Sequence, residues 1–156
     1  MEIRNVLESD YSSIINVLDN WWGGRKMSNM LPKLFFTHFQ DTSFIVEHKG
    51  EIIGFLIGFV SQTFPEEAYI HFVGVSPKFR KQGIGKNLYE KFFEVVKMMS
   101  CNKVRCVTSP INKKSIAYHT KMKFEIQQGD KEIDGVSVYS NYDGTDGDRV
   151  LFLKQI

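Results

Sequence analysis

The chain has 156 residues, of which 42% are hydrophobic and 24% charged, a composition that is ordinary for a globular protein. Its formal net charge at pH 7 is only +2, so charge gives no argument for binding to nucleic acid or to a membrane surface. The N-terminus lacks a signal-peptide pattern, no apolar run approaches the ~18 residues that a membrane helix needs, and Cys101 and Cys106 are spaced for neither a metal site nor a redox motif. We therefore expect a single domain over residues 1–156, in the cytoplasm and without a metal.

Hydrophobic periodicity and turn residues predict about seven strands and four helices. In chain order we expect a strand at 3–6, a helix that starts at 8–10 and is broken by 21–25, a helix at 31–39, strands at 44–47, 51–60 and 69–75, a helix at 83–99, a strand at 103–108, a helix at 112–122, and strands at 124–127 and 149–153. The polar, glycine-rich segment 128–148 is expected to be a loop. This order predicts an α/β (α+β) fold in which one mixed sheet carries helices on both faces.

The most informative stretch is the basic loop between the strand that ends at Val75 and the helix that follows it. Gly83 and Gly85 stand one residue apart in this loop. Glycine lets the backbone approach a ligand closely, and the start of a helix adds unpaired N–H donors and the positive end of a dipole. Four cationic side chains surround the glycines: Lys78, Arg80, Lys81 and Lys86. The loop is therefore suited to a phosphate or a pyrophosphate.

Two common phosphate-binding loops are excluded by single residues. A Walker A loop needs Ser or Thr after the lysine, where Asn87 stands, and a dinucleotide fingerprint needs a third glycine at the position of Leu88. The remaining pattern, Arg80-x-x-Gly83-x-Gly85, resembles the Arg/Gln-x-x-Gly-x-Gly/Ala signature of the GCN5-related N-acetyltransferases (GNAT family), whose order of elements the chain also matches. The alternative is a tight strand–helix turn with a solvated basic face.

The resemblance implies a mostly antiparallel sheet and acetyl-CoA as the cosubstrate. In that family the loop binds the pyrophosphate, and the strand before it splays from its neighbour and pairs with the pantetheine arm. The positions that match imply this set of cofactor-binding residues: Val73, Gly74, Val75, Arg80, Lys81, Gln82, Gly83, Ile84, Gly85, Lys86, Asn112 and Ser115. For Ser115 the alternative is a small residue that allows close packing.

The segment from Asn112 to Phe124 is similar to the family's downstream signature. The tyrosine that protonates the leaving thiolate in that signature aligns with His119, and Tyr118 stands one place earlier; Lys123 replaces the family's glycine. Successive helical residues point about 100° apart, so only one of the two rings can face the thiol. The register of the motif favours His119 as the acid that protonates the thiolate. If the start of the helix is shifted by one residue, Tyr118 is the acid instead. Asn112 is expected either to cap the helix or to contact the pantetheine.

The base that deprotonates the amine is expected on the strand before the loop. His71 titrates near neutral pH and is our candidate for the base or for the organiser of a water. Strict strand alternation would place Tyr69, His71, Val73 and Val75 on one face. Glu67 is a second candidate, and each has a structural alternative, a satisfied sheet histidine or a solvated turn carboxylate.

The acceptor site of the family is built from three segments that are far apart in sequence. The positions that match imply Trp21, Trp22, Tyr69 and Tyr142 as acceptor-binding residues. Aromatic rings at these positions would wall an apolar or cationic acceptor. Tyr139 and Asp143 are expected to line the same cleft. The tryptophan pair has an alternative role as a hydrophobic staple at a helix end.

Together these motifs predict an N-acetyltransferase that transfers an acetyl group to a primary amine by direct attack in a ternary complex. The acceptor is expected to be a small molecule or a peptide, and a homodimer is possible by analogy with the family. The alternative is a non-catalytic sensor that binds CoA or acyl-CoA with the same fold, which the departures at His119 and Lys123 motivate.

Overall fold

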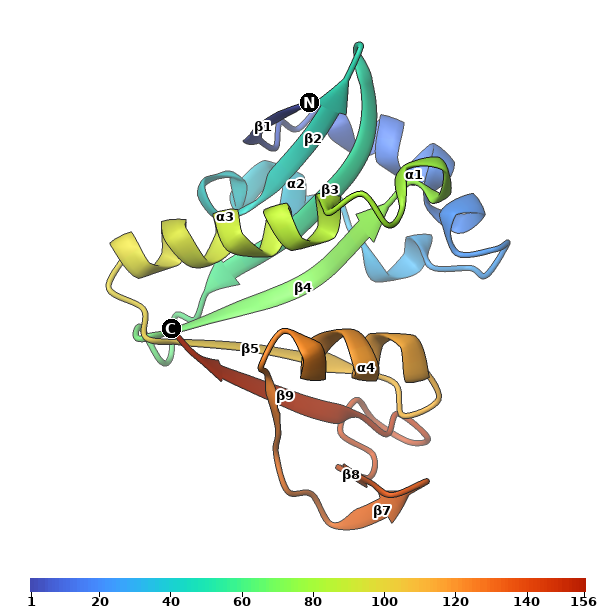
Figure 1. Cartoon of the computed structure of the whole chain (residues 1–156), viewed down its shortest axis with the longest axis vertical. Coiled ribbons are helices and arrows are strands. Elements are labelled where there is room, and N and C mark those ends of the chain that lie inside the picture. Colours follow the sequence, from blue (N-terminus) through green and yellow to red (C-terminus); the bar gives the residue numbers. More distant parts are fainter.

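The computed structural model describes residues 1–156 and has four α-helices and nine strands (Figure 1). The elements are β1 (Glu2–Asn5), α1 (Asp10–Trp21), α2 (Leu34–His38), β2 (Phe44–His48), β3 (Glu51–Val60), β4 (Glu67–Val75), α3 (Ile84–Met98), β5 (Lys103–Thr108), α4 (Lys113–Lys121), β6 (Glu125–Ile126), β7 (Lys131–Ile133), β8 (Val136–Val138) and β9 (Val150–Gln155). Single 3₁₀ turns lie at Ser28–Met30, Gln40–Thr42 and Pro77–Phe79. None of the helices combines the length and the apolar character that a bilayer crossing requires.

The main sheet confirms the predicted mixed α/β fold. Its seven strands lie in the order β1-β2-β3-β4-β5-β9-β6, and every pair is antiparallel except β4–β5. The segment 128–148 was expected to be a loop, but it contains the separate β7–β8 hairpin. Its turn, Asp134-Gly135, has positive φ angles of 49° and 79°, as a tight hairpin turn requires. This dipeptide was the signal for the hairpin.

The strands β4 and β5 are parallel neighbours that diverge (Figure 1). They pair only at Glu67–Lys103, Ala68–Val104 and Tyr69–Arg105. On its other side β4 stays paired with β3 from Ala68 to Val75. The sheet is therefore forked at Tyr69, and the rest of β4 has one open edge.

Helices cover both faces of the sheet and give the chain two hydrophobic cores. The larger core has 18 buried residues and joins α3 to the sheet through Leu88 and Phe92. The smaller core has 10 and joins α1 and α2 to the opposite face through Leu18 and Phe36. Buried apolar side chains of this kind each contribute about 1.5–3 kcal/mol. The core against which a β4 residue packs therefore shows which face of the sheet that residue occupies.

A β-bulge at His71 changes those faces part-way along β4. Ile57 pairs with Phe72 but the next residue of β3 pairs with Ile70, so His71 has no partner. Ile70 belongs to the core under α3, whereas Phe72 belongs to the core under α1 and α2. The expectation of strict alternation was therefore wrong, because one extra residue reverses the side-chain pattern.

Beyond the bulge, the predicted group of four residues divides between the two faces. Val73 and Val75 pack against the core under α3. Tyr69 and His71 stack on Phe59 and Phe35, on the face that α2 covers. A ligand along Val75 and a ligand beside His71 would thus approach β4 from opposite faces.

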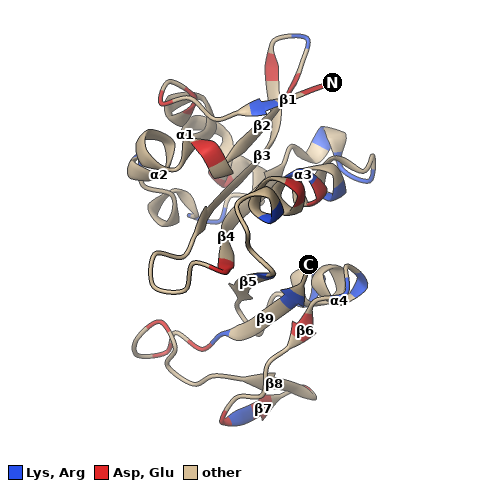
Figure 2. Cartoon of the chain, turned by 90° about the vertical axis from the view of Figure 1, so that its left-hand side faces the viewer, with Lys and Arg blue, Asp and Glu red and all other residues tan.

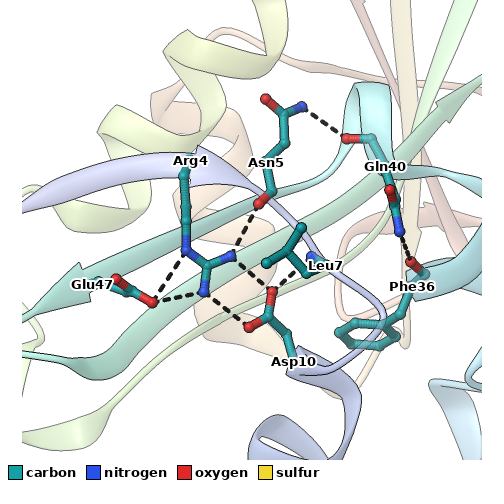
Figure 3. A network of polar contacts seen from close by, with 7 residues as sticks. All are labelled: Arg4, Asn5, Leu7, Asp10, Phe36, Gln40 and Glu47. Carbon is teal, nitrogen blue, oxygen red and sulfur yellow. Dashed lines mark hydrogen bonds and ion pairs between the residues drawn. The ribbon is translucent and has the colours of Figure 1, made fainter.

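An ion-pair network ties the N-terminal strand to the first helix (Figure 3). The guanidinium of Arg4 donates to both carboxylate oxygens of Asp10 (2.8 and 2.9 Å) and to Glu47 (2.7 and 3.1 Å). The Leu7 N–H also donates to Asp10 (2.7 Å). Burial alone would raise the pKa of Asp10, but these hydrogen bonds outweigh it and lower the pKa. The Asp10 carboxylate is thereby held ionised at the edge of the smaller core.

Candidate active site

The loop before α3 presents a run of free backbone donors. No N–H between Arg80 and Lys86 donates a hydrogen bond within the chain, and the first helical bond runs from Asn87 N–H to Gly83 C=O (3.0 Å). No side chain caps this helix start. Lys and Arg residues gather around the loop, whereas acidic residues mark the β8–β9 loop (Figure 2). Unpaired amides, a helix N-terminus and nearby cations together make an anion-binding concavity.

Left-handed backbone at two positions gives the loop its shape. Lys81 has φ = 63° and Gly83 has φ = 81°. A Cβ atom on Gly83 would meet nothing within 4 Å, so the glycine is required by its backbone conformation and not by lack of space. The open space beside Gly83 leaves room for a ligand at the amides.

Arg80 joins this loop to two other segments. Its Nε donates to Val75 C=O (3.2 Å), and its Nη2 donates to Trp21 C=O (2.5 Å). The guanidinium thus connects the end of β4 with the end of α1. The role of the Arg80 side chain toward pyrophosphate stays a prediction, and the other cations of the loop, such as Lys78 and Lys81, are exposed.

The open edge of β4 carries free peptide groups directly before the loop. Ser76 N–H donates to Ile53 C=O (2.8 Å), and bonded and non-bonded pairs alternate along antiparallel strands. Val75 and Val73 therefore stand in the non-bonded pairs with β3, and their N–H and C=O groups point toward β5. Because β5 pairs with β4 only as far as Tyr69, these groups face the fork. Because the Val75 C=O already accepts from Arg80 Nε (3.2 Å), the N–H and C=O of Val73 and the N–H of Val75 are the groups available to the amides of an extended ligand.

The hydroxyl of Tyr118 lies beside the start of α3. A Cβ on Gly85 would stand 3.2 Å from Tyr118 Oη and 3.9 Å from a methyl carbon of Val75, so α4 and the end of β4 meet at this glycine. Burial, and then the charge of Glu90, raises the pKa of Tyr118. The phenol therefore keeps its proton at neutral pH and can donate it.

His119 occupies a different place from its neighbour, inside the larger core. Only 8% of its surface is exposed, and its ring stacks on Phe152 at 4.8 Å. Nδ1 lies 2.7 Å from Ser115 C=O, which can only accept, so Nδ1 carries the proton and Nε2 accepts from Tyr89 O–H at 2.8 Å. Burial lowers the pKa of His119, although the bond to Ser115 opposes this. The ring is a neutral link between α3 and α4.

Asn112 caps the start of α4, which is one of the two roles expected for it. Its side-chain oxygen accepts the Ser115 N–H at 3.2 Å. This bond uses the carboxamide oxygen and leaves the amide nitrogen free for a ligand. Ser115 also places its hydroxyl 3.2 Å from His119 Nδ1.

On the opposite face of β4, His71 has a defined tautomer. Its Nε2 lies 2.6 Å from Met30 C=O, and its ring stacks on Phe35 at 4.3 Å. Because a carbonyl only accepts, Nε2 carries the proton and Nδ1 keeps its lone pair. Burial lowers the pKa of His71, and the hydrogen bond to Met30 opposes this only in part. His71 is therefore a neutral imidazole with a basic nitrogen at neutral pH.

The closed end of the fork holds an ion pair and a cluster of tyrosines. Arg105 donates two hydrogen bonds to Glu67 (2.9 and 3.1 Å), so this candidate base is already occupied. Burial raises the pKa of Tyr69, and the charges of Tyr142, Cys106 and Asp143 act in the same direction. Tyr69 stacks on Phe59 (5.4 Å) and Tyr142 packs edge-on against Tyr139 (6.2 Å), and their role in holding an acceptor stays a prediction.

The two tryptophans differ in their surroundings. Trp21 is 8% exposed and stacks on Phe55 (6.1 Å) within the smaller core. Trp22 is half-buried and packs edge-on against Phe72 (5.1 Å). Only Trp22 has ring surface to offer a ligand.

The sequence alone did not reveal the role of Tyr89, because a tyrosine at a buried helix position looks like any other core residue.

A sheet forked between two parallel strands, with an anion-binding loop leading from the open edge into a helix, defines the architecture of CoA-dependent acetyltransferases. The chain belongs to the Acetyltransferase (GNAT) family, whose model matches residues 4–124. The predicted family and fold class are thus confirmed.

Relatives and solved structures agree with this membership. The L-2,4-diaminobutyric acid acetyltransferase of Vibrio parahaemolyticus is 33% identical over 86 residues, which cover 55% of this chain and 48% of that protein. This chain therefore spans about half the length of the curated relatives it matches.

Two solved structures support the fold over almost the whole chain. Ard1 from Thermoplasma volcanium has a TM-score of 0.78 at 19% identity, covering 99% of this chain and 97% of that one. The diaminobutyrate acetyltransferase EctA from Paenibacillus lautus, in complex with L-2,4-diaminobutyric acid and coenzyme A, has a TM-score of 0.70 at 22% identity, covering 97% and 92%. At these identities the likeness establishes the fold.

Proposed function

We propose that this chain is an N-acetyltransferase that moves the acetyl group of acetyl-CoA to a primary amine by direct attack in a ternary complex. The observation that carries the proposal is the continuity of two sets of free backbone groups. The open edge at Val73 and Val75 is followed, after the turn at residues 76–79, by the unpaired amides of residues 80–86. An extended amide-containing arm that ends in a pyrophosphate matches both sets at once.

Acetyl-CoA would be held on the face of β4 that lies under α3 and α4. It supplies the activated acetyl thioester. Residues 80–86 bind the pyrophosphate, and Val73 and Val75 pair with the pantetheine amides. The Val75 N–H is our candidate donor for the charge that develops on the thioester oxygen. The free amide nitrogen of Asn112 is suited to a carbonyl of the same arm.

Proton transfer is divided between the two faces of β4. His71 Nδ1 takes the proton of the amine, directly or through one water, as the C–N bond forms. As the C–S bond breaks, the hydroxyl of Tyr118 donates its proton to the leaving thiolate. We assign this acid to Tyr118, and not to His119, because the Tyr118 hydroxyl lies beside Gly85 whereas both ring nitrogens of His119 are occupied in the core.

The acceptor is proposed to be a small-molecule or peptide amine, in keeping with the diaminobutyric acid named for the relatives. Because the net charge is only +2, nucleic acid is not proposed as a partner. Both cysteines are free and buried, which suits a reducing cytoplasm. Nothing in the proposed chemistry requires a second subunit, and a homodimer is compatible with it.

The proposal is tested by release of free thiol from acetyl-CoA in the presence of a panel of primary amines. We expect turnover that depends on the amine and on the enzyme. Turnover with any amine excludes a non-catalytic sensor. If calorimetry shows CoA binding but no amine supports thiol release, the sensor is correct and the enzyme assignment is wrong.

A further inference from the structure

Five aromatic rings form a continuous arc on the acceptor face of β4. His71 stacks on Phe35 (4.3 Å), Phe35 contacts Phe39 (5.3 Å), Phe39 contacts Phe59 (5.4 Å), and Phe59 stacks on Tyr69 (5.4 Å). We call these five residues the aromatic arc. It begins and ends on β4, at the two residues that flank Ile70, and all five rings are half-buried. The proposed base is thus one end of the arc, and the last residue before the fork is the other.

Three rings of the arc do not serve the hydrophobic cores. Phe39, Phe59 and Tyr69 are neither among the buried residues of the two cores nor among the partly buried residues packed against them. Phe39 and Phe59 instead line a surface hollow of about 420 Å³. Rings that stack on one another beside a hollow, outside either core, provide apolar surface for a ligand.

Two arginines at the closed end of the fork, beside Tyr69, are already paired. Arg105 binds Glu67 at 2.9 Å, and Arg149 binds Asp143 at 2.8 Å. A free amino acid that placed its carboxylate at either arginine would have to break an existing ion pair. The arc itself offers a ligand ring surface, with the basic nitrogen of His71 at one end, and Asp41 in the same hollow belongs to no ion pair.

We propose that the acceptor is an arylalkylamine, a primary amine joined to an aromatic ring by a short alkyl chain. Its ring lies against the aromatic arc, and its amine reaches Nδ1 of His71 at the fork. This inference rests on the proposed function and specifies its substrate class. It separates this chain from the amino-acid acceptor named for its relatives.

Matched amines test the inference with the whole chain and acetyl-CoA. The probes are 2-phenylethylamine, n-butylamine as the amine without a ring, and L-2,4-diaminobutyrate. We expect kcat/KM for 2-phenylethylamine to exceed that for each of the other two by about tenfold or more, as a buried aromatic contact provides. If either of the other two amines equals or exceeds 2-phenylethylamine, the inference is overturned while the proposed function stands.

Leucine variants test whether the ring of 2-phenylethylamine lies against the aromatic arc. Phe59→Leu and Phe39→Leu should each lower kcat/KM for 2-phenylethylamine about tenfold and change that for n-butylamine by less than about twofold. The control is Phe64→Leu, a phenylalanine outside the arc that is 54% exposed, which should change neither value. Equal losses for both amines in both arc variants, with unchanged melting temperatures, would contradict the inference.

A binding measurement keeps the inference separate from catalysis. If no amine is turned over, the proposed function fails, and 2-phenylethylamine is titrated calorimetrically into the chain saturated with CoA. Binding that Phe59→Leu and Phe39→Leu weaken, and that Phe64→Leu leaves unchanged, upholds the arc as an arylalkylamine site. Absence of binding, or binding indifferent to all three variants, overturns it.

Discussion

The two edges of β4 differ in what their peptide groups do. The edge toward β3 is paired along the strand, from Ala68 to Val75, whereas the edge toward β5 is paired only through Tyr69. Buried backbone groups that lack partners are costly, so an unpaired edge inside a sheet needs something else to bind. One edge of β4 therefore holds the fold together, and the other edge is suited to hold a ligand.

Gly83→Asp gives the largest expected effect on the open edge. The substitution puts a carboxylate beside the free amides, and like charges at close range cost several kcal/mol, so CoA affinity should fall by about 1,000-fold. Calorimetry with CoA measures this. The control is Gly50→Asp, because Gly50 has nearly the same φ (78° against 81°) and equal open space but lies in the β2–β3 turn. Undiminished CoA affinity in Gly83→Asp would refute the loop assignment.

His71→Gln tests the acceptor side of the fork. We expect kcat to fall by about 100-fold, the usual contribution of a positioned base. In the wild type, burial lowers the pKa of His71 below its ordinary 6.5, so kcat/KM should be constant above that pH and fall as the pH drops through the lowered value. The variant should lose this acidic limb. A profile that keeps the limb in His71→Gln would assign it to another group.

Tyr118→Phe tests the assignment of the acid. We expect kcat to fall by about 30-fold, less than for the base, because a thiolate with a pKa of about 8.5 leaves without much assistance. CoA affinity and melting temperature should not change.

The neighbour provides the matched comparison. His119→Asn should leave Tyr89 without its acceptor and lower the free energy of unfolding by about 2 kcal/mol. If Tyr118→Phe is fully active and His119→Asn loses kcat at wild-type stability, the roles of the two residues are reversed.

Asp10→Asn tests the paired part of the fold, away from the open edge. We expect it to lower the free energy of unfolding by about 2 kcal/mol at pH 7, since it weakens a largely buried pair while Arg4 keeps Glu47. The folded pKa of Asp10 lies below its ordinary 3.8, so this contribution is complete at neutral pH and is lost as the pH falls through the folded value. Urea titrations at pH 7 and pH 3 measure it.

A second ion pair serves as the control for Asp10. Glu67→Gln breaks the pair with Arg105, whose side chain is 35% exposed, and should cost less than about 1 kcal/mol. If Glu67→Gln costs more than Asp10→Asn, the fork depends on its ion pair more than the N-terminal network does.

The sequence was sufficient for the features that depend on local chemistry. The apolar spacing of 84–98 predicted α3, and Gly83 and Gly85 predicted the anion-binding loop before it. Asn112 predicted the start of α4. Each of these signals lies within a few residues of the structure it specifies, which is why single-sequence reasoning finds it.

Features that depend on distant partners were not predictable. The bulge at His71 exists only in the register that β4 adopts against β3, and it moved Tyr69 and Val75 to opposite faces. The burial of His119 depends on the hydroxyl of Tyr89, on another helix. Local periodicity contains neither the register nor that contact.

Amide hydrogen exchange, with and without CoA, measures ligand protection along the open edge of β4 and in the loop before α3. We expect CoA to slow exchange at Val73, Val75 and residues 80–86. The amides that β4 already shares with β3, including those of Phe72 and Gly74, should change little. Unchanged exchange along the open edge and the loop, with protection at another surface, would contradict the account.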